Sequence, residues 1–440
     1  MPEELKIECR WLGRSTGSAI DRSFFADIGL AVGEDWLTQL EDSEASTVRN
    51  HLRGCAYQLA TWFATNWWRL RWEPEIPGWS KDSKWRVAHS MAAAGNGYVW
   101  PNVIFATDGN SLAVACLPRT KAAVFEPIRY LNRIQAWVSA AEFERKVDGF
   151  MEGVLSRLES RQVGDTDLKV LWMEILEERN DPMTSERRKL EAMAGFDPDE
   201  APSVLLKEIL EDESHFGREA VAEVTAEARD SVLKVLELIR ELVKAKGNSK
   251  EGRFRVSLPD LHIPSKFAGP FERPWQKGAA LARIARQQWN LDAEPVENKT
   301  LGKLLNANAG LFTRSSTAGT RIPFGVRKGS GDAFDVFFDS PNETSRRFAM
   351  CRMIGDHLFF GNEEKLVPAT RAKTARQQFQ RAFAQEFLCP IEALRAQLPP
   401  QPDEDDISNV AKCFHVSPLL VRTTLVNKGE LDREALNWND

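Results

Sequence analysis

Hydrophobic residues recur at two different spacings along this chain, and each spacing predicts a different kind of element. In segments 55–68 and 232–243, apolar side chains fall at intervals of three and four residues, which predicts amphipathic helices. Two short apolar runs, 98–105 and 111–117, flank the turn-forming sequence Asp108-Gly109-Asn110. This arrangement predicts two strands joined as a hairpin.

These patterns predict a multidomain α+β protein. A chain of 440 residues is longer than one ordinary domain. We expect a Trp-rich α+β domain at residues 1–130, a helical region at 131–250 and a third domain at 265–440. The Lys- and Gly-rich segment 244–253 is the predicted linker before the third domain.

Tryptophan is concentrated at the start of the chain, where nine of the fourteen lie within the first hundred residues. Such a cluster could form a surface for stacking a ligand or a base. Core packing is the favoured interpretation, because large aromatic side chains end up mainly buried.

Segment 346–360, RRFAMCRMIGDHLFF, predicts a helix in the frame of a zinc-peptidase active-site helix. In the pattern H-E-x-x-H, two His one helical turn apart bind the metal, and the Glu polarises the attacking water. Here the three matching positions hold Arg352, Met353 and Asp356. The frame is present, and its catalytic residues are replaced.

The helix and four further segments resemble the ImmA/IrrE family of metallopeptidases. In chain order the further motifs are PWQKG with LAR (274–283), FDVFF (334–338), FAQEFLCP (383–390), and VA with FHVSP (410–418). The resemblance runs over roughly residues 265–430 and implies a zincin-like C-terminal domain that includes the terminal helices. The family's third ligand is a Glu, and its best-matching position here is Gln377, with Phe379 the next candidate.

A catalytic zinc site needs three protein ligands and one open position. Arg352 is a permanent cation that repels a metal, and Met353 has no group that can accept a proton. Gln377 supplies no carboxylate. We therefore expect no catalytic residues, no bound metal and no other cofactor.

An alternative keeps a zinc ion on Asp356 and His357, with Glu363 or Glu364 completing the site. Asp356 and His357 lie about 100° apart around the helix, so they cannot share the original ligand geometry. Arg352 and Asp356, four residues apart, could instead form a salt bridge that replaces the metal as a cross-link.

Two cysteines, Cys351 and Cys389, fall near the former active site in the family frame. A nucleophile pair between a cysteine and His357 is conceivable. Two small buried thiols are the favoured interpretation.

Composition favours a cytoplasmic protein. The six Cys are scattered with no C-x-x-C spacing, which argues against a disulfide framework and a structural zinc site. No run of eighteen apolar residues occurs, so we expect no membrane span. The polar, acidic N-terminus does not have the pattern of a signal peptide.

The net charge of −6 conceals a gradient, because residues 265–385 carry 19 Lys and Arg against 11 Asp and Glu, a balance of +8. This basic part could contact nucleic acid, and segment 407–428 could be read as a helix-turn-helix. The basic residues are dispersed, however, and an acidic stretch precedes that segment. Contact with acidic helices of the same chain is therefore favoured.

The resemblance implies three competing functions. The first is a catalytically degenerate, peptidase-like regulatory component that binds a protein partner, such as a co-encoded regulator, in a bacterial stress, mobile-element or phage-defence system. The second is a divergent metallo-endopeptidase that cleaves a regulatory protein. The third is a nucleic-acid-binding regulator.

Overall fold

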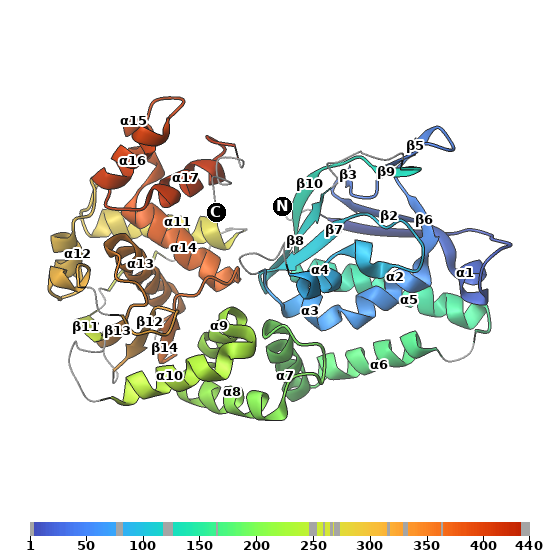
Figure 1. Ribbon diagram of the computed structural model, residues 1–440, viewed down its shortest axis with the longest axis horizontal. Helices are drawn as coiled ribbons and strands as arrows, with labels where there is room; N and C mark the ends of the chain where they lie inside the picture. Colours follow the sequence, from blue (N-terminus) through green and yellow to red (C-terminus); the bar gives the residue numbers. More distant parts are fainter. Residues whose placement is uncertain are drawn as a thin grey trace. The chain divides into compact units, whose positions relative to one another are not determined.

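The computed structural model describes residues 4–75, 82–117, 126–163, 166–245, 253–257, 260–264, 267, 273–314, 317–328, 333–361 and 364–432 (Figure 1). These residues form helices and several small sheets, which confirms the α+β class. The chain divides into two compact units: unit 1 is Met1–Leu206 with Ala372–Thr374, and unit 2 is Lys207–Arg371 with Ala375–Asp440. None of the described helices is both long and apolar enough to cross a membrane.

Unit 1 contains three antiparallel sheets in its described part. In the first sheet β2 pairs with β1, β3 and β6; the second has the order β10-β8-β7 and the third β5-β4-β9. The strands are β1 Leu5–Trp11, β2 Phe25–Val32, β3 Asp35–Trp36, β4 Leu40–Asp42, β5 Thr47–Arg49, β6 Leu52–Cys55, β7 Val103–Thr107, β8 Ser111–Cys116, β9 Ile128–Tyr130 and β10 Ile134–Ser139.

The helices of unit 1 pack against these sheets or, in the case of the last two, against other helices of the unit (Figure 1). They are α1 Ala19–Phe24, α2 Ala56–Thr65, α3 Trp67–Trp72, α4 Ser83–His89, the 3-10 turn η2 Met91–Ala94, α5 Ala140–Ser160, α6 Asp167–Asn180 and α7 Pro182–Met193. The helix predicted at 55–68 is therefore two helices, α2 and α3, with Asn66 between them. The proline at position 74 follows the end of α3, as expected from its missing N–H.

The predicted hairpin is confirmed, with Thr107 of β7 opposite Leu112 of β8. The Asp108 carboxylate accepts hydrogen bonds from the backbone N–H groups of Asn110 at 2.9 Å and Ser111 at 2.7 Å. Gly109 has a φ of +95°, a conformation that glycine adopts without steric cost. The first strand begins at residue 103 rather than 98.

The N-terminal tryptophans mainly form a core. Trp62, Trp67, Trp68, Trp85 and Trp100 are each no more than 6% exposed. The ring of Trp67 stacks on Phe143 at 6.0 Å between centroids and meets Trp172 edge-on at 5.4 Å. Core packing is confirmed for these five residues.

The helices predicted as one middle region are shared between the units. Helix α5 buries Phe143, Val147, Phe150 and Val154 in the core of unit 1, so it belongs with the strands before residue 130. Unit 2 begins within α8, Ser203–Phe216, and also contains α9, Arg218–Ala228, the turn η3, Arg229–Ser231, and α10, Val232–Lys244. The amphipathic helix predicted at 232–243 is confirmed as α10. Most of the predicted linker, residues 246–252, lies outside the described residues.

Unit 2 is built on one antiparallel sheet with the order β11-β13-β12-β14, which lies beside α13 (Figure 1). Its strands are β11 Arg253–Ser257, β12 Phe324–Arg327, β13 Ala333–Phe337 and β14 Leu366–Pro368. Its remaining helices are α11 Pro274–Gln288, α12 Asn298–Leu304, η5 Ala309–Leu311, α13 Glu343–Phe360, α14 Ala375–Leu388, α15 Ile391–Gln397, α16 Glu404–Cys413 and α17 Pro418–Asn427. The strand and helices predicted at 334–338, 346–360 and within 407–428 are all present.

Two glycines allow α14 to approach its neighbouring helices closely. A Cβ atom on Gly278 of α11 would lie 2.3 Å from the backbone oxygen of Phe379, and one on Gly355 of α13 would lie 2.6 Å from Cγ of Phe383. Neither approach is compatible with a larger side chain in the present packing. Both glycines belong to the motifs that carry the family resemblance: Gly278 allows the close approach of α11 to α14, and Gly355 that of α13 to α14.

A buried charged cluster lies in unit 1. Glu73 accepts a hydrogen bond from Nε of Arg69 at 2.7 Å and lies 3.0 Å from Nε2 of His89. Glu73 and His89 are fully buried, and the imidazole stacks on Trp85 at 4.1 Å between centroids. Burial by itself raises the pKa of Glu73, but the bonds and charges of His89 and Arg69 outweigh it and lower the pKa to about 2.

This cluster predicts a loss of stability in acid. Because the pKa of Glu73 falls from 4.5 to about 2 on folding, its contribution is complete above pH 4.5 and disappears as the pH falls towards 2. We expect the difference in unfolding free energy between wild type and Glu73→Gln, up to about 3 kcal/mol, to shrink over that window. Urea denaturation at a series of pH values measures it. A difference that is constant with pH would contradict the assignment.

Candidate functional site

The four positions singled out by the sequence meet in the interior of unit 2. Arg352, Met353 and Asp356 project from α13, and Gln377 projects from α14. Met353, Asp356 and Gln377 are fully buried, and Arg352 is 6% exposed. The helix–helix approach at Gly355 brings the two helices close enough for these side chains to bond directly.

Arg352 is held entirely by oxygen atoms. Its guanidinium donates to the backbone oxygen of Ala369 at 3.2 Å, to that of Thr370, and to Oε1 of Gln377. Burial, followed by the nearby charge of Arg381, lowers the pKa of Arg352 to about 9. The side chain therefore connects α13, the segment after β14 and α14 through one planar group.

Gln377 has both ends of its amide engaged. Its Oε1 also accepts from the backbone N–H of Thr370 at 3.0 Å, and its Nε2 donates to the backbone oxygen of Pro368 at 3.2 Å. These contacts require the oxygen to face Arg352. The second candidate for this position, Phe379, is an apolar core residue whose ring lies 4.7 Å from that of Phe359.

Asp356 pairs with a partner that the sequence analysis did not consider. Nε and a terminal nitrogen of Arg376 donate to its two carboxylate oxygens at 2.7 and 2.8 Å, and Nε2 of Gln380 donates at 2.7 Å. The salt bridge suggested between Arg352 and Asp356 is therefore replaced by one between α14 and α13. Planar bidentate contact with Arg376 is the stronger geometry.

The charged network continues towards α9. A second terminal nitrogen of Arg376 donates to Glu364 at 2.5 Å, and Glu364 in turn accepts from the backbone N–H of Ala220 at 3.0 Å in the first turn of α9. Burial alone would lower the pKa of Arg376, but the carboxylates of Asp356 and Glu364 raise it. Asp356 is thus one end of a chain of charges that also caps a helix.

His357 faces away from Asp356. Its Nδ1 lies 2.7 Å from a guanidinium nitrogen of Arg327 on β12, so Nδ1 accepts this bond and the proton is on Nε2. The ring meets Phe334 edge-on at 5.5 Å. Asp356 and His357, the two main ligands of the alternative zinc site, therefore lie on different sides of α13. Of its possible third ligands, Glu364 pairs with Arg376, and Glu363 lies outside the described residues.

The donor set can be compared with the chemistry of a zinc site. In the described part of the chain, no group of three or more His, Cys, Asp or Glu side chains is placed to hold a metal ion. Where the resemblance places metal ligands, the side chains are a guanidinium, a carboxylate that is already paired, and an amide. These groups do not fit a catalytic zinc ion.

Met353 and the two cysteines near this network are buried. Sδ of Met353 packs close to Gly325 of β12. Cys351 and Cys389 are fully buried, and burial raises the pKa of the Cys351 thiol to about 12. A thiol with this pKa is not ionised at neutral pH, so the favoured interpretation of these cysteines as buried thiols is confirmed.

The residues missed from the sequence are Arg376, Gln380 and Arg327. The first two lie four residues apart on one face of α14, next to Gln377. The run of polar residues 376–378 in an otherwise apolar helix could have indicated a buried hydrogen-bonding network, because polar groups in an interior need partners. No comparable signal marked Arg327, which comes from a strand distant in sequence.

Comparison of the chain with protein-family models, with curated proteins and with solved structures gives no match. The resemblance to the ImmA/IrrE family therefore stays a prediction, based on the sequence motifs.

The pairing of Asp356 with Arg376 predicts a large loss of stability when the carboxylate is removed. Asp356→Ala removes the bidentate partner of a buried guanidinium, which keeps its ion pair with Glu364, and we expect a loss of about 3–5 kcal/mol in the free energy of unfolding. Urea denaturation measures this loss.

Two further variants serve as controls. Asp356→Asn keeps an acceptor of the same shape, so its loss should be smaller than that of alanine. Asp432→Ala removes an exposed carboxylate and should change stability by less than about 0.5 kcal/mol. A loss below about 1 kcal/mol for Asp356→Ala would show that the pair is not a main constraint on α13 and α14.

Proposed function

We propose that unit 2 is a peptidase-like scaffold without a catalytic metal, and that the protein acts as a regulatory component by binding a protein partner. The family resemblance suggests a bacterial stress, mobile-element or phage-defence system as the setting. In this proposal the buried network around Arg352 maintains the scaffold and performs no hydrolysis.

The observation that carries this proposal is the hydrogen bond between Arg352 and Gln377. These residues are 25 positions apart, and the resemblance assigns them to the first and third metal ligands. A zincin-like arrangement of α13 and α14 would bring these two positions together. Their contact supports the peptidase-like geometry, while their chemistry is unsuited to hydrolysis.

Two features argue against a working hydrolytic centre. The guanidinium of Arg352 stays charged at neutral pH and lies among the groups that would otherwise surround a cation. The thioether of Met353 cannot take a proton from water, so no general base stands at the position of the catalytic Glu. Both features disfavour the divergent metallo-endopeptidase.

Part of the basic character of segment 265–385 is internal, although other basic residues, such as Lys299, Lys303 and Arg321, are exposed. Five of its arginines are buried and donate to backbone carbonyl groups: Arg286, Arg327, Arg346, Arg347 and Arg352. Cations used in this way are not presented to phosphate groups. This observation weakens the proposal of a nucleic-acid-binding regulator.

The geometry predicts that a zinc site can be rebuilt. The double variant Arg352→His with Gln377→Glu keeps the native Asp356 as a third ligand, and a quadruple variant adds Met353→Glu and Asp356→His. We expect about one zinc per chain in at least one rebuilt variant and far less in the wild type, measured by elemental analysis after dialysis against dilute zinc.

The control Arg395→His with Gln397→Glu introduces the same residue types on the exposed face of α15 and should bind no additional zinc. Circular dichroism identifies variants that keep the native fold. Folded rebuilt variants without zinc would contradict the peptidase-like geometry. Stoichiometric zinc in the wild type, lost in Asp356→Asn or His357→Ala, would favour the metallo-endopeptidase instead.

A binding function predicts that the partner stays intact. A protein captured from the native host by the full-length chain, then purified, should form a stable complex on size exclusion. Its mass should be unchanged after prolonged incubation, with or without a chelator. Chelator-sensitive cleavage of that partner would overturn the proposal.

A further inference from the structure

Strand β1 forms one edge of the first sheet of unit 1. In the part of the chain that the structure describes, β2 is its only strand partner and pairs with all seven of its residues. An edge strand of this kind presents backbone groups with which a further strand can pair. The edge of β1 is therefore a candidate interaction surface.

Two backbone hydrogen bonds show which groups of β1 point towards this edge. The N–H of Gly33, next to the end of β2, donates to the oxygen of Glu4 at 2.9 Å. At the other end, the N–H of Leu12 donates to the oxygen of Phe25 at 2.9 Å. Backbone groups alternate in direction along a strand, so even-numbered residues face β2. The residues whose N–H and C=O groups face the open edge are Leu5, Ile7, Cys9 and Trp11.

Helix α5 runs along β1 and leaves space beside it. Lys146 forms an ion pair with Glu4 at 2.8 Å, and the guanidinium of Arg157 lies 5.0 Å from the centre of the Trp11 ring. Gly153 lies on the same side of α5, two helical turns from Lys146 and one from Arg157. It is exposed, and a Cβ atom there would meet no atom within 4 Å. This flank of the helix is therefore open between its two contacts with β1.

The charges along β1 alternate in sign. Glu4, Lys6, Glu8 and Arg10 lie on one face of the strand, opposite the residues that pack against the core. Their side chains are 33–71% exposed, so all four are accessible. An alternating series can match a reversed copy of itself, because antiparallel pairing brings residues of different number together.

The backbone restricts the registers in which two copies of β1 can pair. With Ile7 opposite Ile7 of the second copy, Leu5 lies opposite Cys9. All these residues have their N–H and C=O groups directed to the open edge, so they form hydrogen-bonded pairs. The arrangement has a two-fold axis at Ile7, as expected for a dimer of identical chains.

The same register matches the charges. It places Lys6 opposite Glu8 of the second copy and Glu4 opposite Arg10, and symmetry repeats both pairs. Opposite charges at facing positions stabilise a sheet, whereas like charges destabilise it. A register centred on Glu8 would instead place Lys6 opposite Arg10 and Glu8 opposite itself. The charges therefore favour the register centred on Ile7.

We propose that two copies of this protein associate through β1, in antiparallel register about Ile7, and so form one continuous sheet from both chains. A second copy is favoured over a strand of another protein, because the charges of β1 complement themselves in a register that the backbone allows. The contact involves unit 1 alone and is independent of the function proposed for unit 2.

Sedimentation velocity of the full-length chain over a concentration series tests the association. Wild type should form dimers. Glu8→Lys sets two like-charge pairs against Lys6 and should raise the dissociation constant about tenfold. Exchange of both charges, Lys6→Glu with Glu8→Lys, restores opposite charges and should restore the dimer. Both variants lose the contact between Glu8 and Nε2 of His51 at 2.9 Å, so damage within the monomer does not explain a rescue.

The control Glu44→Lys makes the same exchange at an exposed position outside β1 and should leave the dissociation constant unchanged. A wild type that is monomeric at every concentration would overturn the proposal and leave the edge to a strand of another protein. A dimer that Glu8→Lys does not weaken would place the contact elsewhere. Failure of the double exchange to restore the dimer would exclude the register centred on Ile7.

Hydrogen exchange followed by NMR tests the main-chain pairing itself. The amide of Ile7 should exchange more slowly as the protein concentration rises, because it donates to the second copy. The amide of Lys6 points towards β2 within one chain and should exchange at a rate that does not depend on concentration. Exchange of the Ile7 amide that is equally independent of concentration, in a protein that dimerises, would also overturn the proposal.

Discussion

The interior of unit 2 depends on one buried cation, the guanidinium of Arg352. It bonds to carbonyl oxygens of Ala369 and Thr370 and to the amide of Gln377, and so joins two helices and the end of a strand. A metal ion also links the segments of the chain that carry its ligands. A planar group with five N–H donors can replace that cross-link, but it leaves no open position for a reacting water.

The same principle recurs through this unit. Arg286 donates to the backbone oxygens of Asp292 and Phe387, and Arg347 to those of His415 and Val296. Buried carbonyl groups at the ends of helices and loops need donors, and a guanidinium satisfies several of them at once. Desolvation lowers the pKa of Arg286 and of Arg347. Donation to several backbone oxygens explains why these arginines lie in the interior, and the explanation requires no nucleic acid.

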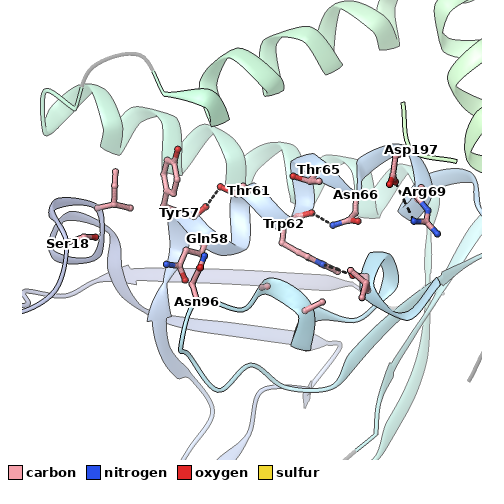
Figure 2. Close-up of a pocket in the computed structure, with 14 residues that line it drawn as sticks. Ser18, Tyr57, Gln58, Thr61, Trp62, Thr65, Asn66, Arg69, Asn96 and Asp197 are labelled. Carbon is pink, nitrogen blue, oxygen red and sulfur yellow. Dashed lines mark hydrogen bonds and ion pairs between the residues drawn. The ribbon is translucent and has the colours of Figure 1, made fainter. Parts of the chain in front are cut away.

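Unit 1 combines an aromatic interior with one buried charged cluster. The tryptophans and the cluster of Glu73, His89 and Arg69 are buried and hold the sheets and helices together. Arg69 extends this cluster, because its guanidinium pairs with Asp197 as well as with Glu73. The pair of Arg69 and Asp197 lies at one end of a groove of about 540 Å³ alongside α2 (Figure 2).

The sequence by itself determined the elements whose signals are local. Period and turn chemistry predicted α10 and the hairpin of β7 and β8, because helix and strand spacing and the Asp108-Gly109-Asn110 turn depend on neighbouring residues only. The helix α13 was predicted from its motif. Residue identity also led to the prediction that Arg352, Met353 and Gln377 do not form a hydrolytic site.

Only the tertiary structure decided which partners these residues have. Asp356 pairs with Arg376 rather than with Arg352, because close helix packing at Gly355 brings α14 opposite α13. The division into two units was also beyond local pattern, since α5 belongs with whichever sheet buries its apolar face. Long-range packing sets these choices, and a hydrophobic period records that a face is buried without recording what covers it.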